Sequence, residues 1–215
     1  MVGSASSQNL SSCLRVLGVD PAASGPTGYA IIESEGSECR VLYYGAFRTA
    51  SKLRKASEGA ALQEVHSLLC DLIARFKPQI MAVESVFSAL NVRTALRLAE
   101  VRGVVFLAGQ QNGVEVRSYS PREVKACVAG YGHADKKQMQ LMVKAQLGMR
   151  EVPEPSDAAD AIAVALCYLQ TAALEQRFGV KKADLASTAK PKSQKRATTP
   201  GHVVLGRGIR IQADR

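Results

Sequence analysis

The chain has 215 residues, a formal net charge of +9 and a pI near 9.5, and 47% of its residues are apolar. This length and apolar content indicate one folded domain with a hydrophobic core plus an appendage, and they exclude a wholly disordered chain. No uninterrupted apolar run approaches about 18 residues, so we expect no membrane-spanning helix.

The positive charge is concentrated at the C-terminus. Residues 180–215 hold nine of the 28 basic residues and two of the 19 acidic residues, a net of +7. We therefore expect a polar, flexible leader over 1–13, a folded domain over 14–179 and a basic, disordered tail over 180–215. The leader lacks the basic start and apolar run of a secretory signal, and the five scattered cysteines include no CxxC pair. Both features favour a cytoplasmic protein with reduced thiols.

The predicted elements begin with strands and then alternate. Apolar and β-branched runs predict strands over 14–20, 28–34 and 39–48, with two later strands over 80–87 and 114–120. Helical spacing and breaker residues predict helices over 57–76, 91–110, 121–129, 136–147 and 157–178. This order predicts an α/β fold with a mixed five-stranded sheet, antiparallel in its first three strands and then parallel, flanked by helices on both faces.

Four acidic residues stand in apolar surroundings: Asp20, Glu84, Asp157 and Asp160. Asp20 ends the first predicted strand, where it is also suited to begin a turn. Glu84 interrupts an otherwise apolar strand and there needs a partner. Asp157 and Asp160 fall on one face of a predicted helix, although an acid in the first turn of a helix is common because it complements the helix dipole.

One cause accounts for all four acids better than four separate explanations. If they converge, their mutual repulsion must be relieved by cations, and Mg²⁺ or Mn²⁺ prefers oxygen ligands of this kind. Two such ions about 4 Å apart suit the cleavage of a phosphodiester. A basic protein that contains an acidic cluster is therefore expected to act on nucleic acid as a metal-dependent nuclease.

Several motifs make the chain similar to the RuvC family of bacterial Holliday-junction endonucleases, which have a ribonuclease H-like fold. The resemblance covers residues 14–177, roughly three quarters of the chain, in the order that the family has. The matching stretches are LGVDPAASGPTGYAII at 17–32, MAVESVF at 81–87, ALRLAEVRGV at 95–104, SPREVKACVAGYGHADKKQMQLMV at 120–143 and PSDAADAIAVAL at 155–166.

The resemblance implies an enzyme that resolves four-way DNA junctions in recombination and repair. It implies a homodimer that makes paired symmetric nicks with metal-activated water, holding two Mg²⁺ per subunit with Mn²⁺ as a substitute. A branch-migration complex of the RuvA–RuvB type is the implied protein partner, and the implied location is the bacterial cytoplasm, at the nucleoid. By match, Asp20, Glu84, Asp157 and Asp160 are the catalytic, metal-binding acids.

Three further residues are implied to contact DNA. Phe87 matches an aromatic residue that stacks on bases near the junction centre, although a Phe is more often part of a core. Lys125 and Lys136 match lysines that contact DNA. Arg93, Arg97 and Arg102, on the helix over 91–110, are candidates for DNA contacts or for a subunit interface.

The sequence departs from the family pattern near the expected site. Ala22 replaces a usual glycine, Pro26 is an extra residue in the first loop, and Leu90 stands where relatives often have a lysine. His133 occupies a loop position that is more often small, and a solvated loop residue is its simplest interpretation.

Two other functions remain open from the sequence. GVDPAASGPTG is also similar to a phosphate loop of actin-like ATPases, but a second acidic, Gly-rich loop of that class is not visible. A non-catalytic junction-binding protein is the other alternative, and the presence of all four acids argues against it.

Overall fold

The computed structural model describes residues 13–23, 25–36, 38–49, 59–85 and 91–179. Within them the strands are β1 Leu14–Asp20, β2 Thr27–Glu35, β3 Glu38–Phe47, β4 Ile80–Glu84 and β5 Glu115–Tyr119. The helices are α1 Ala60–Phe76, α2 Val92–Gln111, α3 Pro121–Ala129, α4 Lys136–Gln146 and α5 Ser156–Phe178. The expected leader up to residue 12 and the expected tail lie outside the described residues, so both stay predictions.

The five strands form one mixed sheet in the order β3-β2-β1-β4-β5. β1 pairs with β2 and β2 with β3 in antiparallel fashion, whereas β4 is parallel to both β1 and β5. The predicted sheet, antiparallel first and then parallel, is therefore confirmed. One difference concerns β4, which ends at Glu84 instead of continuing to residue 87. The last pair of the β4–β5 ladder is Glu84 with Tyr119, so Glu84 closes the strand and does not interrupt it.

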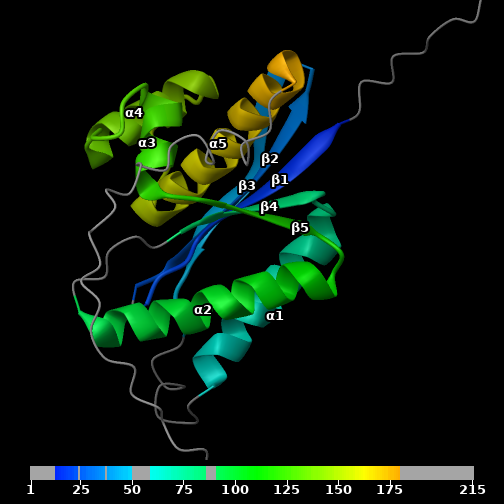
Figure 1. Cartoon of the computed structure of the whole chain (residues 1–215), viewed down its shortest axis with the longest axis vertical. Helices are drawn as coiled ribbons and strands as arrows, with labels where there is room; N and C mark the ends of the chain where they lie inside the picture. Colours follow the sequence, from blue (N-terminus) through cyan, green and yellow to red (C-terminus); the bar gives the residue numbers. More distant parts are fainter. Residues whose placement is uncertain (1–12, 24, 37, 50–58, 86–90, 180–215) are drawn as a thin grey trace, which may run out of the picture. The chain divides into compact units, whose positions relative to one another are not determined.

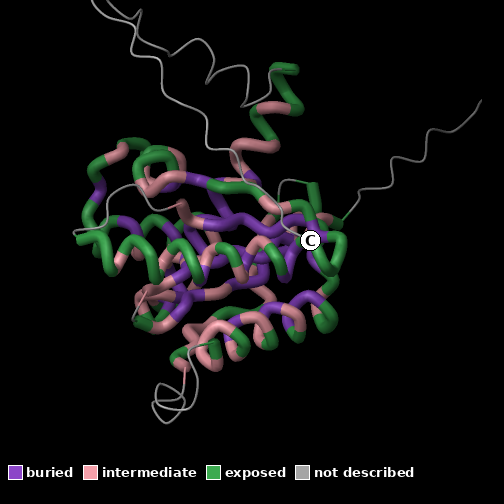
Figure 2. Tube along the Cα trace, turned by 60° about the horizontal axis from the view of Figure 1, so that its bottom comes forward, coloured by how far each residue is buried: buried purple, intermediate pink, exposed green. Residues whose placement is uncertain are grey.

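Helices cover both faces of the sheet (Figure 1). α5 crosses one face with α3 and α4 beside it, and α1 and α2 lie on the other face. Alternation along the strands divides the core accordingly: Val16 and Ala82 face α5, while Leu17 and Met81 face α1 and α2. Figure 2 shows buried residues running through the strands and the inward sides of the helices. The central strands are apolar on both faces because both faces are covered.

Local signals define where several helices begin and end. α3 and α4 each begin with a capping box, made by Ser120 with Glu123 and by Asp135 with Gln138. α1 ends at Lys77, which has a left-handed backbone immediately before Pro78. The Asp135 cap fixes the start of α4, whose first residue, Lys136, contacts Asp160.

α5 is the one described helix long and apolar enough to cross a membrane by length and composition. Most of its apolar stretch is buried, and residues from Ala158 to Leu169 pack into the core on its face of the sheet. A helix that forms the centre of a core has the same composition, so the packing explains its apolarity without a membrane.

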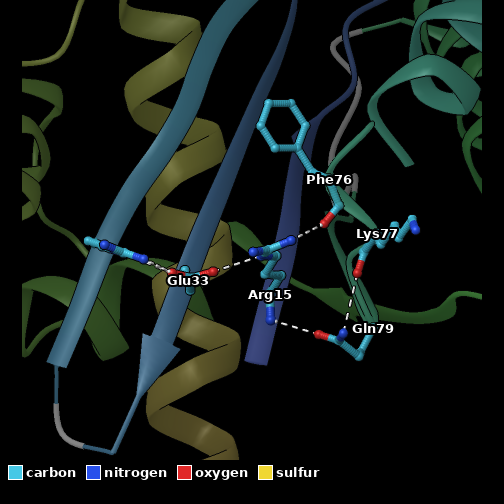
Figure 3. A network of polar contacts seen from close by, with 6 residues as sticks. Arg15, Glu33, Phe76, Lys77 and Gln79 are labelled. Carbon is cyan, nitrogen blue, oxygen red and sulfur yellow. Dashed lines mark hydrogen bonds and ion pairs between the residues drawn. The ribbon is translucent and has the colours of Figure 1, made fainter. Parts of the chain in front are cut away.

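A network of polar side chains ties the sheet together at the end opposite Asp20 (Figure 3). Glu33 of β2 is only 3% exposed and pairs with Arg15 of β1 at 2.7 Å and with Arg40 of β3. Arg15 also donates to the carbonyl oxygen of Phe76 at 3.0 Å, which links β1 to the end of α1. Both arginines lower the pKa of Glu33 to about 2, so this buried acid is charged and fully paired within the protein.

Candidate active site

Asp20 and Glu84 end two neighbouring parallel strands, β1 and β4. Counting back in twos, Asp20 lies on the same face as Gly18 and Val16, and Glu84 on the same face as Ala82 and Ile80, which is the face covered by α5. Functional groups of open sheets with parallel strands gather at the carboxyl ends of the strands. Strand alternation alone thus brings these two acids to one place.

The two carboxyls strongly perturb each other. Burial, followed by the charges of Glu84, Asp160 and Asp157, raises the pKa of Asp20 to about 8. Burial and the charge of Asp160 raise the pKa of Glu84 to about 7, although a hydrogen bond from Asp20 lowers it in part. In the metal-free protein these surroundings favour the protonated form of Asp20, with its carboxyl as the donor in the hydrogen bond to Glu84.

Asp157 and Asp160 come from the first two turns of α5. The helix approaches the sheet so closely that two strand glycines have no room for a side chain. A Cβ atom on Gly28 would lie 1.9 Å from the Asp157 carbonyl oxygen, and one on Gly18 would lie 2.1 Å from that of Ala161. Gly28 is the register partner of Asp20, so the backbone contact at Gly28 sets Asp157 beside the end of β1.

Neither Gly18 nor Gly28 was assigned a role from the sequence alone. A glycine inside a strand is the signal that could have identified them, because it often marks a close approach of another backbone. Which backbone approaches is a property of the tertiary fold.

Lys125 and Lys136 reach the acids from α3 and α4. The ammonium nitrogen of Lys136 lies 3.2 Å from Oδ2 of Asp160. Burial raises the pKa of Asp160, and Lys136 opposes that rise. Lys125 lowers the pKa of both Glu84 and Asp160. The two lysines matched to DNA contacts are thus placed at the rim of the acidic cluster.

The donor set fits a hard divalent cation. All four candidate ligands are carboxylates, the ligands that Mg²⁺ and Mn²⁺ prefer. Burial first, and neighbouring acids second, raise the pKa of Asp20, Glu84 and Asp160, and a bound cation would oppose both effects. In the described part of the chain, no three acidic, His or Cys side chains are gathered tightly enough to ligate a single ion. Closely spaced carboxylates repel each other, so a cation would draw these side chains together.

The remaining candidate residues lie in loops or outside the described residues. Phe87 and Leu90 lie outside the described residues, and their roles stay predictions. His133 is exposed in the turn before α4, which agrees with its interpretation as a solvated loop residue.

Ala22 and Pro26 lie half-buried in the loop between β1 and β2. β1 and β2 keep their pairing up to Asp20 and Gly28 despite these two departures from the family pattern.

Comparison with known proteins identifies relatives over this whole domain. Residues 16–168 match the family model "Crossover junction endodeoxyribonuclease RuvC". The chain is 44% identical to the crossover junction endodeoxyribonuclease RuvC of Caldicellulosiruptor saccharolyticus, over 73% of this chain and 92% of the relative. It is 42% identical to that of Chloroflexus aggregans, over 78% of this chain and 99% of the relative.

Solved structures agree with the sequence relatives. T. thermophilus RuvC in complex with a Holliday junction substrate superposes with a TM-score of 0.69 at 30% identity, covering 75% of this chain and 96% of that one. The yeast mitochondrial Holliday junction resolvase, at 15% identity and a TM-score of 0.57, shares the fold. The predicted ribonuclease H-like fold is thereby confirmed. The chain belongs to the RuvC family of crossover junction endodeoxyribonucleases.

Proposed function

We propose that this protein is a crossover junction endodeoxyribonuclease that resolves Holliday junctions by paired symmetric nicks. The observation that carries the proposal is the set of four acids at the ends of β1 and β4 and the start of α5, with two lysines at its rim. Family membership and the likeness to a RuvC bound to a Holliday junction support the same substrate. Neither alternative, an actin-like ATPase or a non-catalytic junction-binding protein, is supported by these relatives.

In this mechanism the four acids hold two Mg²⁺ ions per subunit, with Mn²⁺ as a substitute. When bound, such ions supply a nucleophile at neutral pH and neutralise charge that develops on the phosphate. Because the pKa of Asp20 is raised, binding of a metal ion would compete with protonation of this carboxyl. Asp157 and Asp160 lie three residues apart on α5, and the contacts of α5 with Gly18 and Gly28 set how close both acids come to the end of β1.

The lysines and Phe87 position the DNA. Lys125 and Lys136 provide cations beside the acids, where the phosphate backbone must enter. Phe87, in the segment after β4, stacks on a base near the junction centre. The cations hold the phosphate backbone without reading the base sequence.

Paired nicks require two active sites, and α2 offers a surface for a second copy. Its first half is largely exposed, with Val92 at 76% and Leu96 at 61% exposure. Apolar side chains of this size on one helix face are typical of an interface. We assign the homodimer contact to this half of α2, with Arg93 and Arg97 beside it.

The likeness to bacterial relatives supports a proposal for the cellular setting. In it, the enzyme acts in the cytoplasm at the nucleoid, together with a branch-migration complex of the RuvA–RuvB type. All five cysteines lie in described residues and have free thiols, which suits a reducing compartment.

The test compares cleavage of a synthetic four-way junction and of its linear duplex with Mg²⁺, for the natural chain and for Glu84→Gln. We expect paired nicks confined to the junction, and a loss of at least about a thousandfold in nicking rate for Glu84→Gln with junction binding retained, because a lost ligand costs several kcal/mol of barrier. Undiminished cleavage by Glu84→Gln would contradict the role of the acids.

A further inference from the structure

The ammonium group of Lys136 has two candidate partners, the Asp160 carboxylate and a DNA phosphate. It is the first residue of α4, held there by the Asp135 cap, and its ammonium nitrogen is 3.2 Å from Oδ2 of Asp160. Asp160 is one of the four carboxylates assigned to metal binding above. In the metal-free protein one of the candidate ligand oxygens is therefore paired with a cation that belongs to the protein itself.

Exposure to water makes the ion pair between Lys136 and Asp160 weak. The Lys136 side chain is 54% exposed and that of Asp160 30% exposed, so water screens the attraction between them. A lysine carries its charge on a flexible stem and can turn to a nearby phosphate without movement of the helix. At the other end of the sheet, by contrast, the Glu33 side chain is only 4% exposed and pairs with Arg15 and Arg40 at once, so loss of one partner leaves the other in place.

We propose that Lys136 competes with the metal for Asp160 and is released to a DNA phosphate when metal binds. The inference rests on the proposed function, because it takes the acids as metal ligands. A divalent cation that binds without DNA must break the pair and leave an ammonium group beside it. When a junction is present the ammonium gains a phosphate partner, so metal and junction strengthen each other's binding by the same factor.

The adjacent residue supplies a matched control. Lys137 carries the same charge on the same turn of α4 and is exposed, but it points about 100° away around the helix axis. Lys136→Gln and Lys137→Gln therefore remove the same net charge, and only the first removes the partner of Asp160. Lys136→Arg keeps a cation at the position.

The first measurement is Mn²⁺ binding to the full-length protein without DNA at pH 8.5, where protons compete least. We expect Lys136→Gln to bind Mn²⁺ about fivefold more tightly than the natural chain, which corresponds to an exposed ion pair of about 1 kcal/mol. Lys137→Gln and Lys136→Arg should stay within about twofold of the natural chain. Thermal unfolding followed by circular dichroism checks that each variant is folded.

The second measurement is junction affinity with and without Ca²⁺, a hard cation with the same preference for oxygen ligands, and with strand integrity checked on a denaturing gel. The factor by which Ca²⁺ tightens junction binding should be smaller for Lys136→Gln than for the natural chain or Lys137→Gln. Equal factors in all three proteins would overturn the coupling.

The outcomes separate this inference from the proposed function. If the natural chain binds Mn²⁺ and Lys136→Gln binds it equally or more weakly, competition at Asp160 is wrong and the nuclease assignment stands. If Lys136→Gln and Lys137→Gln both bind Mn²⁺ more tightly by the same factor, the cause is the loss of one positive charge. That result would also overturn the competition at Asp160. If the natural chain does not bind Mn²⁺, or binds it as well after Asp20→Asn, the metal site of the proposed function is itself wrong.

Discussion

Buried acids at the two ends of the sheet are treated in opposite ways by their surroundings. Arg15 and Arg40 lower the pKa of Glu33 to about 2, so that acid is charged and paired inside the protein. Burial and neighbouring acids raise the pKa of Asp20 to about 8 and that of Glu84 to about 7, despite the nearby Lys125. At the scale of single residues, a lowered pKa beside two arginines is typical of a structural ion pair. Raised pKa values in a cluster of acids are typical of a site that binds a cation from solution.

The raised pKa of Asp20 predicts how the stability of the metal-free protein depends on pH. The unfolded chain ionises this carboxyl near its ordinary pKa of about 4, whereas the folded protein keeps it protonated up to about 8. The contribution of Asp20 to the free energy of unfolding therefore falls as pH rises from 4 to 8. In the presence of EDTA, Asp20→Asn should raise the free energy of unfolding at pH 8 by on the order of 2 kcal/mol, and by less at pH 5.

Urea unfolding at the two pH values measures this difference. Asp71→Asn, at an exposed position on α1, is the control and should change little at either pH. An equal gain from Asp20→Asn at pH 5 and pH 8 would mean that the protonation of Asp20 is not the cause.

At the scale of elements, the position of α5 on the sheet decides the geometry of the site. Gly28→Ala introduces a Cβ atom 1.9 Å from the Asp157 carbonyl oxygen, and a backbone atom cannot yield as a flexible side chain can. We expect a loss of about 1–3 kcal/mol of stability and at least a tenfold loss of nicking, because α5 must move away from β2.

Gly25→Ala is the matched control, since the nearest atom to its added Cβ is 3.7 Å away, at ordinary contact distance. Nicking rates and urea unfolding of the two variants are compared. Normal nicking by Gly28→Ala would show that the start of α5 is positioned by other contacts.

The exposed half of α2 makes a separate prediction about assembly. Leu96→Glu places a charge on the surface assigned to the dimer and should weaken dimerisation by at least about tenfold, which sedimentation of the protein alone can measure. Leu174 is 55% exposed near the end of α5, comparable to 61% for Leu96, so Leu174→Glu is a matched control. If Leu174→Glu weakens the dimer and Leu96→Glu does not, the interface lies elsewhere.

At the scale of the whole molecule, charge divides between two functions. Residues 180–215 carry a net +7 of the total +9, which suits a sequence-independent attraction to DNA. A chain that ends at Gly179 should keep metal-dependent nicking, while its binding to linear duplex becomes weaker and less dependent on salt. Filter binding over a range of salt concentrations, with junction nicking in parallel, measures both. A truncated protein that binds junctions but no longer nicks them would contradict this division.

Much of this fold was predictable because local signals and tertiary packing agree. The apolar alternation of β1 and β4, the Ser120 and Asp135 caps, and the Ala-rich α5 all specify their elements from nearby residues alone. The end of β4 was predicted too late, because strand propensity continues past Glu84 while the ladder with β5 stops there.

The sequence by itself predicted which residues carry the chemistry, because acids within apolar runs and the order of a family's motifs can be recognised without a structure. The tertiary structure alone decided how these residues meet. Asp20 and Glu84 shift each other's pKa, Gly28 contacts the backbone of Asp157, and Lys136 pairs with Asp160 across two helices. Each of these contacts joins elements distant in the chain, and its strength depends on burial and distance, which only the packed molecule defines.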